Sequence, residues 1–288
     1  MPDTVIDVSA LCYTYRGAPR RALDRTEFTV DRGEIFGFLG PNGAGKSTTQ
    51  KILIGLLRDY EGEVQVLGRD LPDWSPDYYE HVGVAFEFPN HYLKLTGREN
   101  LTYFAALYRG DTLAPAEILE RVDLAADADK PVGRYSKGMK RRLSVARALL
   151  NDPELVFLDE PTGGLDPVSG RRVKELLREQ RDRGKTIFLT THDMAVADEL
   201  CDRVAFIVDG VIAAVDSPRR LKLRHGRRQV RVEVSDGEGS ASEVFPLAGL
   251  GDDPGFLRLL REREVQTIHS LEATLEDVFV EVTGRSLT

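Results

Sequence analysis

GPNGAGKST, residues 40–48, is the stretch that decides the fold of this chain of 288 residues. Its glycines let the backbone turn its N–H groups toward a polyphosphate, Lys46 can reach the terminal phosphates, and the hydroxyl of Ser47 can bind Mg²⁺. The spacing G-x-x-x-x-G-K-[ST] arises by accident in roughly 1% of chains of this length, so a simple glycine-rich turn is the less favoured interpretation. The residues expected to surround the phosphates are Gly40, Pro41, Asn42, Gly43, Ala44, Gly45, Lys46, Ser47 and Thr48.

The residues on either side of this loop predict a strand before it and a helix after it. Residues 34–39 are mostly apolar and β-prone, as in a buried parallel strand, and residues 46–57 carry apolar side chains at helical spacing. Strand, loop and helix in this order place the loop at a helix N-terminus, where phosphate is bound.

A second apolar run, LVFLDE at residues 155–160, ends in two carboxylates. Ligands of α/β sheets bind at the carboxyl ends of strands, so Asp159 and Glu160 are expected to face the phosphates. Asp159 is the expected partner of Mg²⁺, directly or through water, and Glu160 is expected to polarise the attacking water. An ordinary strand-end turn is the alternative for the acidic pair alone. The two motifs together predict that ATP is bound and hydrolysed with Mg²⁺ as cofactor.

Further motifs follow in order, and through them residues 5 to about 216 resemble the ATP-binding subunits of ATP-binding-cassette (ABC) transporters. YSKGM at residues 135–139 is similar to the family's LSGGQ signature, and residues 164–166, Gly-Leu-Asp, match its D-loop. His192, which follows a β-like run, matches the switch histidine. Tyr15 looks like the aromatic residue that stacks on adenine, with Tyr13 as the competing choice.

The resemblance implies an α/β fold, the P-loop NTPase cassette with a RecA-like core and an inserted helical subdomain. Residues 1–218 are expected to form the ATPase domain, with the helical subdomain at about 89–150. Residues 219–288 are expected to form a small α+β accessory domain, similar to the C-terminal extension of drug-exporter ABC systems.

The resemblance also implies roles for four residues outside the phosphate loop. Ser136 and Gly138 would contact the ATP held by a second subunit, and Asp166 would also belong to the nucleotide site. His192 would bond the γ-phosphate or the attacking water and act with the catalytic Glu160. The alternatives are a simple helix N-cap for Ser136 and a polar surface or core residue for His192.

Two positions depart from the family pattern. Glu87 stands where the family has a glutamine, and it is expected to contact Mg²⁺ or water, although it also adds negative charge near the phosphates and Glu160. In the signature, Lys137 and Met139 replace Gly and Gln, while the hydroxyl and the second glycine are retained.

Periodicity predicts the remaining elements. Helices are expected at residues 98–108, 116–122, 137–150, 167–183 and 270–283; strands at 186–190 and 229–234; a hairpin at 204–215 turning at 209–210; and a loop at 236–240. The basic run at residues 219–228 predicts a solvated helix and turn, with attraction to lipid headgroups or an acidic protein as the alternative.

Composition bounds the class of protein. A net charge of −8 argues against nucleic acid as a partner, and the two cysteines, Cys12 and Cys201, suggest buried reduced thiols. The N-terminus does not resemble a signal peptide, and no apolar run approaches the 18 residues of a membrane span. We therefore expect a cytoplasmic subunit, peripheral on the inner face of the membrane.

The expected partners are a membrane-spanning permease and a second ATP-binding cassette. The dimer of cassettes is expected to power substrate movement, in the direction of export. Residues 86–93 and the helix that follows them are expected to form the groove that grips a cytoplasmic helix of the permease, and a well-packed hinge is the alternative. Two other functions remain as alternatives: an ABC-type ATPase that remodels a ribosome or nucleic-acid complex, and a kinase for a small metabolite.

Overall fold

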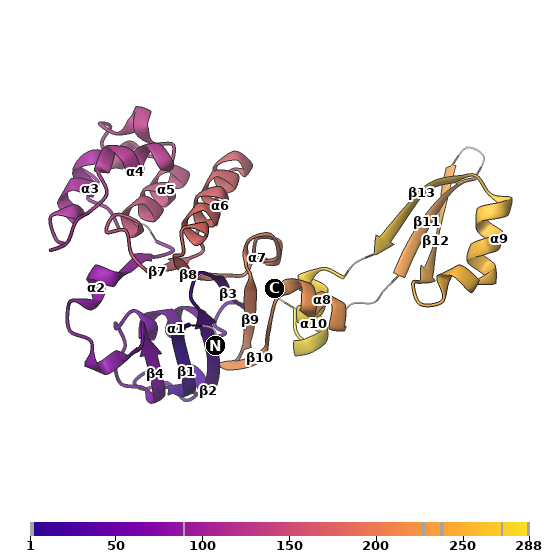
Figure 1. Cartoon of the computed structure of the whole chain (residues 1–288), viewed down its shortest axis with the longest axis horizontal. Helices are drawn as coiled ribbons and strands as arrows, with labels where there is room; N and C mark the ends of the chain where they lie inside the picture. Colours follow the sequence, from indigo (N-terminus) through magenta and orange to yellow (C-terminus); the bar gives the residue numbers. More distant parts are fainter. Residues whose placement is uncertain (1–2, 89, 226–228, 237–238, 272, 287–288) are drawn as a thin grey trace. The chain divides into compact units, whose positions relative to one another are not determined.

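The computed structural model describes residues 3–88, 90–225, 229–236, 239–271 and 273–286. The chain divides into two compact units, Met1–Pro218 with Ser286–Thr288, and Arg219–Arg285 (Figure 1). Four sets of residues with sequence-based expectations lie outside the described part: Pro89, residues 226–228 of the basic run, residues 237–238 of the expected loop and Glu272 of the expected C-terminal helix.

A six-stranded sheet forms the centre of the first unit, in the order β10-β9-β3-β8-β7-β6. Its neighbouring strands run parallel except for the final hairpin. The strands are β3 (Ile35–Leu39), β6 (Val82–Ala85), β7 (Leu155–Asp159), β8 (Thr186–Thr191), β9 (Arg203–Val208) and β10 (Val211–Asp216). The strands predicted before the phosphate loop, before the acidic pair and before His192 are confirmed, as is the hairpin.

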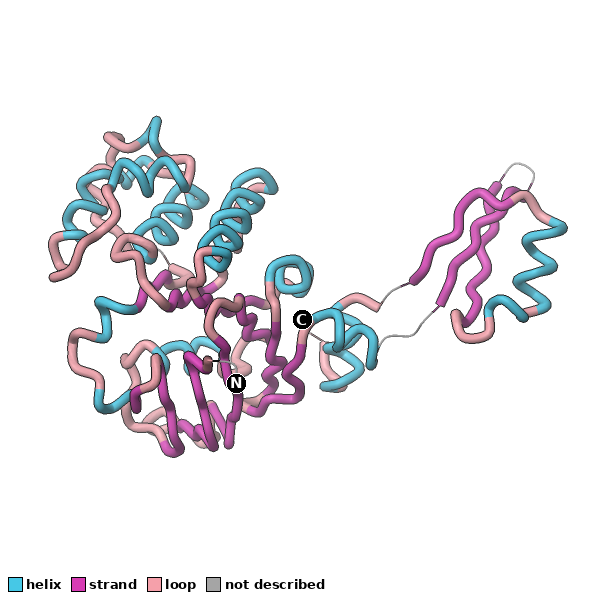
Figure 2. The backbone as a smooth tube through the Cα atoms, viewed as in Figure 1, coloured by secondary structure: helices cyan, strands magenta, loops and turns pink. Residues whose placement is uncertain are grey.

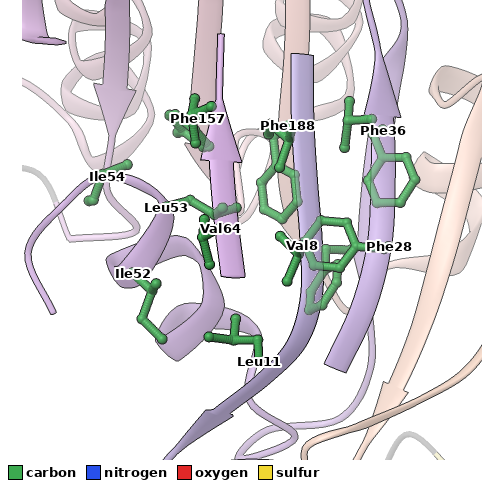
Figure 3. Close-up of a cluster of buried hydrophobic side chains, with 14 of the residues drawn as sticks. Val8, Leu11, Phe28, Phe36, Ile52, Leu53, Ile54, Val64, Phe157 and Phe188 are labelled. Carbon is green, nitrogen blue, oxygen red and sulfur yellow. The ribbon is translucent and has the colours of Figure 1, made fainter. Parts of the chain in front are cut away.

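An antiparallel sheet in the order β2-β1-β4-β5 packs with it around an aromatic core. Its strands are β1 (Thr4–Tyr13), β2 (Leu23–Asp31), β4 (Glu61–Val66) and β5 (Arg69–Asp70). The ring of Phe28 lies 5.8 Å from that of Phe36 and 6.1 Å from that of Phe188, which joins β2 to β3 and β8 (Figure 3). Ile52 and Leu53 of α1 (Lys46–Leu53) belong to the same cluster, so the core anchors both ends of the phosphate loop.

The helices predicted between residues 97 and 150 are confirmed (Figure 2). They are α3 (Gly97–Ala105), α4 (Pro115–Arg121) and α5 (Lys137–Ala148), with 3-10 turns η2 (Ala125–Asp127) and η3 (Val132–Arg134). α5 lies against β6 so closely that a Cβ at Gly83 would fall 1.7 Å from the carbonyl oxygen of Ala148. The first unit also contains η1 (Leu71–Asp73), α2 (Tyr78–His81), α6 (Pro167–Asp182) and α7 (Met194–Leu200).

The second unit contains a three-stranded antiparallel sheet in the order β12-β11-β13. Its elements are α8 (Pro218–His225), β11 (Gln229–Asp236), β12 (Gly239–Pro246), η4 (Leu250–Asp252), α9 (Pro254–Glu262), β13 (Val265–Leu271) and α10 (Leu275–Thr283). Alternate valines of β11 form a small core with Phe245 and Leu259. The helix expected in the basic run and the strand expected from residue 229 are confirmed.

Two expectations for this unit are wrong. The loop expected at residues 236–240 is wrong at residues 236, 239 and 240, because β11 extends to Asp236 and β12 starts at Gly239. The helix expected from residue 270 begins at Leu275, because the hydroxyl of Thr274 and the carboxylate of Asp277 form a capping box there. Leu271 therefore belongs to β13.

Candidate nucleotide site

The phosphate loop connects the end of β3 to the start of α1. All five residues of β3 are buried, so the sheet fixes the point from which the loop leaves. Gly43 and Gly45 have φ angles of 80° and 114°, a region that favours glycine. Gly45 caps α1, and Ser47 in its first turn is exposed. The loop therefore presents backbone N–H groups and a hydroxyl at a helix N-terminus.

The β9–β10 hairpin packs against this loop. A Cβ at Gly40 would fall 2.2 Å from the carbonyl oxygen of Ile207, so only glycine fits there. The N–H of Gly210 donates to the carbonyl of Ala44 at 2.9 Å, and the carbonyl of Gly210 accepts from the hydroxyl of Thr26 at 2.8 Å.

Lys46 lies inside this loop and is only 8% exposed. Its ammonium group donates to the carbonyls of Gly40 at 2.5 Å and Pro41 at 3.0 Å. Burial lowers the pKa of Lys46, and the nearby charges of Glu160, Asp159 and Glu87 oppose that shift. Sequence reasoning places Lys46 and these carboxylates in one site, and the structure brings them within electrostatic reach of one another.

Tyr15 contacts the phosphate-loop helix. Its hydroxyl and the hydroxyl of Thr48 are 3.1 Å apart, and the residue is 39% exposed. Tyr13 packs edge-on against it, with ring centroids 4.9 Å apart. An exposed ring held at the first turn of α1 is suited to stacking on a base.

Asp159 ends β7, and the parallel pairing of strands places it opposite Thr190 of β8. The Thr190 hydroxyl donates to its carboxylate. This contact orients an acid whose side chain is only partly buried.

Glu160 follows in a left-handed conformation, with φ at 49°. Its carboxylate is almost fully buried and accepts from the Thr191 hydroxyl at 2.9 Å. It also accepts from the backbone N–H of His192 at 2.9 Å and from the ring Nδ1–H at 2.6 Å. A strained backbone maintained by several hydrogen bonds is characteristic of functional sites, and the structure brings the two expected catalytic residues into direct contact.

The oxygen donors expected to hold Mg²⁺ are Ser47, Asp159 and Glu87. Among the residues that the structure describes, no group of three His, Cys, Asp or Glu side chains is arranged to hold a metal ion. Hydroxyl and carboxylate oxygens nevertheless fit Mg²⁺, which takes one or two carboxylates and completes its shell with water and substrate phosphates.

The signature and the D-loop lie side by side. Ser136 is the N-cap of α5 and accepts from the N–H of Met139 at 3.1 Å. A Cβ at Gly138 would touch Leu165 at 3.4 Å. Asp166 caps α6 and accepts from the N–H groups of two residues of its first turn, at 3.0 and 3.1 Å. Those hydrogen bonds, led by that from Ser169, hold the pKa of Asp166 below its ordinary value.

Sequence reasoning missed three polar residues of the site: Thr190, Thr191 and Arg141. The two threonines precede His192, and the pairing of β8 with β7 follows from the predicted parallel sheet. Arg141 is 5% exposed although it lies in a basic run. It shares a helical stripe with the buried Val145 and Ala148, and that spacing is the signal that could have identified it.

A cavity of about 550 Å³ opens beside the helical subdomain. Phe86, His91 and Tyr92 of the predicted groove line it, whereas Leu93 is exposed but is not among its lining residues. Arg147 of α5 donates to the carbonyl of Asn90 at 2.7 Å and lies 4.6 Å from the ring of Phe104. The remaining lining residues are Ile54, Leu56, Tyr79, Val82, Val84 and Tyr108.

Two family models match the chain, one in each unit. The model of the ABC transporter family matches residues 23–163, and that of the fluoroquinolone efflux ABC transporter C-terminal domain matches residues 228–272. A fluoroquinolones export ATP-binding protein of Mycobacterium tuberculosis is 60% identical, over 99% of this chain and 95% of its own.

Two solved structures have the fold of the first unit. An ATP-binding subunit of an ABC transporter has a TM-score of 0.69 at 32% identity, covering 77% of this chain and 93% of its own. A dimeric ATP-binding cassette in a post-hydrolysis state, bound to ADP and Pi, has a TM-score of 0.67 at 27% identity, covering 74% and 98%.

Proposed function

The chain belongs to the ATP-binding subunits of ABC transporters and is an ATPase, and from this premise we propose that it drives export through a separate permease. The observation that carries the hydrolytic part of the proposal is the contact between Glu160 and His192 beside the phosphate loop. It provides a general base and its orienting partner next to a polyphosphate site.

In the proposed mechanism each residue has a distinct task. The N–H groups after Leu39 and the ammonium of Lys46 bind the phosphates, and Tyr15 stacks on the adenine ring. Glu160 accepts a proton from the attacking water, and His192 keeps its carboxylate aimed at that water and bonds the γ-phosphate. Strain at the backbone of Glu160 and three hydrogen bonds limit its carboxylate to one orientation.

Ser47, Asp159 and Glu87 would hold Mg²⁺ in this mechanism. The ion would supply positive charge that neutralises the phosphate oxygens as the terminal phosphate leaves. The hydroxyl of Thr190 fixes the orientation of Asp159.

A second copy of the chain would complete the site. Ser136 and Gly138 stand at the exposed start of α5, where N–H groups and a hydroxyl suit an anion. We assign them to the ATP held by the partner cassette, with Asp166 nearby at the start of α6. The dimeric relative bound to ADP and Pi supports this arrangement.

The cavity beside α5 is the proposed docking site for a cytoplasmic helix of the permease. Its aromatic and aliphatic lining suits the apolar face of an amphipathic helix. Every helix in the described ranges is too short or too polar to cross a bilayer. We place the chain at the inner face of the membrane, where it would be held by the permease.

The relative cited above is named for export of fluoroquinolones. We propose that this chain energises efflux of the same class of compound. The match of residues 228–272 to the C-terminal domain of such efflux systems supports the assignment.

Co-purification from membranes tests the proposal. The tagged full chain should bring down one polytopic membrane protein, and ATP hydrolysis by the complex should raise efflux of a fluorescent fluoroquinolone. Tyr92→Glu should abolish assembly, whereas Val211→Glu, an equally exposed apolar residue on β10, should not. Assembly that survives Tyr92→Glu would refute the proposed docking groove. An isolated chain without affinity for nucleotide would refute the proposed function.

A further inference from the structure

Arg141 is a buried cation in the second turn of α5, with 5% of its surface exposed. Burying a guanidinium group is costly unless acceptors and opposite charges surround it. What surrounds this side chain therefore indicates what it does.

One atom of Arg141 bridges two parts of the nucleotide site. Its Nη1 donates to the carbonyl of Phe86 at 3.3 Å and to the carbonyl of Asp159 at 3.2 Å. The first carbonyl immediately precedes Glu87, and the second belongs to the expected Mg²⁺ ligand at the end of β7. Arg141 thus ties the segment after β6 to the last residue of β7.

Arg141 also lies in the field of three carboxylates. Burial lowers the pKa of the guanidinium, and the charges of Glu87, Asp159 and Glu160, in that order, oppose the shift. Lys46 senses the same three acids. The site therefore contains two buried cations and three carboxylates, and Glu87 is the acid that acts most strongly on Arg141.

We propose that Arg141 is a positioning residue that offsets the charge of Glu87 and holds the Phe86–Glu87 backbone against the end of β7. This rests on the proposed nucleotide site, in which Glu87 stands where the family has a neutral glutamine. A carboxylate there adds repulsion toward Asp159, Glu160 and the phosphates. A cation on α5, beside the same backbone, compensates for that added charge.

The position of Arg141 on α5 has a mechanical consequence. Ser136 caps the same helix, so a displacement of α5 on contact with the partner's nucleotide would move Arg141 as well. Through its two carbonyl bonds, Arg141 would transmit that displacement to Glu87 and Asp159 together.

A double-mutant cycle on the full chain tests this pairing. Arg141→Gln should lower kcat about tenfold, the size of coupling found within one hydrogen-bond network, while the KM for ATP changes little because the hydrogen bonds of Arg141 go to carbonyls of the protein. Glu87→Gln gives the reference kcat for a background that lacks this carboxylate. The double variant should regain at least about threefold over Arg141→Gln, because the unbalanced carboxylate is gone. Arg141→Lys keeps the charge, so its kcat should lie between the kcat of Arg141→Gln and that of the wild type.

Arg142 provides the matched control. It is the next residue of α5, but its guanidinium binds Val122, Asp123 and the Asp123 carboxylate in the helical subdomain. Arg142→Gln should therefore show no coupling to Glu87→Gln.

Thermal unfolding without nucleotide gives a readout that does not depend on turnover. Arg141→Gln should lower Tm by about 3 °C or more, and by less in the Glu87→Gln background. If the effects of Arg141→Gln and Glu87→Gln were additive in both kcat and Tm, the proposed interaction of Arg141 with Glu87 would be overturned. A wild type that neither binds nor hydrolyses ATP would overturn the proposed function, whereas the Tm cycle would still decide whether Arg141 and Glu87 interact.

Discussion

The carboxylate of Glu160 accepts a hydrogen bond of 2.6 Å from Nδ1–H of His192, across the ends of two neighbouring parallel strands. The histidine ring is largely exposed while the carboxylate is almost fully buried. The buried carboxylate of Glu160 is therefore hydrogen-bonded to an exposed ring, and that ring is accessible to a bound nucleotide.

Glu160→Gln should bind ATP with near-normal affinity and lose about 10²- to 10⁴-fold in turnover, because the amide cannot accept the proton of the attacking water. Phosphate release and nucleotide binding measured on the same preparation check this. Glu154→Gln is the control, since Glu154 precedes the same strand at its other end and pairs with Arg32 and His81 at the surface. Turnover of Glu160→Gln close to that of the control would refute the assignment.

Thr191→Val should lower turnover about tenfold, because the buried Glu160 carboxylate loses one of its donors at an expected cost of about 1–3 kcal/mol. Thr186→Val removes a hydroxyl from the opposite end of β8, where it accepts from the N–H of Gly33 at 3.0 Å. That variant should lose stability and keep its kcat. Equal kcat losses in the two variants would show that the Thr191 contact is merely structural.

Gly40→Ala should weaken ATP binding at least tenfold, because the new Cβ would overlap the carbonyl oxygen of Ile207 and displace the loop, a strain of about 1–3 kcal/mol. Titration of a fluorescent ATP analogue measures the change. Gly170→Ala places the same methyl group in open space on α6 and should leave affinity intact. Unchanged affinity in Gly40→Ala would show that the loop tolerates the displacement.

Protonation of His91 should lower the free energy of unfolding at acidic pH. Burial, with the charges of Arg147 and Lys140, lowers its pKa from 6.5 to about 4, against the hydrogen bond to the Lys140 carbonyl. The unfolded chain binds the proton first, so stability is full above pH 6.5 and decreases as pH falls toward 4, by at most about 2 kcal/mol at pH 5.

Thermal unfolding at pH 7.5 and pH 5 checks the His91 prediction. His91→Gln should lose less Tm over this interval than the wild type, whereas His269→Gln, an exposed residue of β13, should keep the wild-type dependence. An identical pH dependence in all three proteins would contradict it.

The nucleotide-binding half of the fold could be predicted because its strands are buried on both faces. β3 and β8 contain only buried residues, and such runs stand out in a sequence. The phosphate loop, the acidic pair and His192 each follow a strand directly. Once these strands were predicted correctly, the site residues could be located at one edge of the sheet.

The C-terminal unit was less predictable because β13 buries little. No residue of β13 is fully buried, so it lacks the alternation that identifies a strand. Leu271 lies at helical spacing with Leu275 and Val278, which extended the expected helix over residues that form β13. The capping box at Thr274 was the available signal. Arg141 was not predicted to belong to the site, because a charged residue within a basic run is ordinarily solvated, whereas Arg141 is buried.

The β9–β10 turn links the nucleotide loop to a part of the chain that contains none of its motifs. Gly210 donates to Ala44 inside the loop and receives the hydroxyl of Thr26, while a Cβ at Gly210 would collide with the backbone of Ala22. A substitution in this hairpin would thus appear in a genetic screen as lost nucleotide affinity, in a protein whose motifs are all intact.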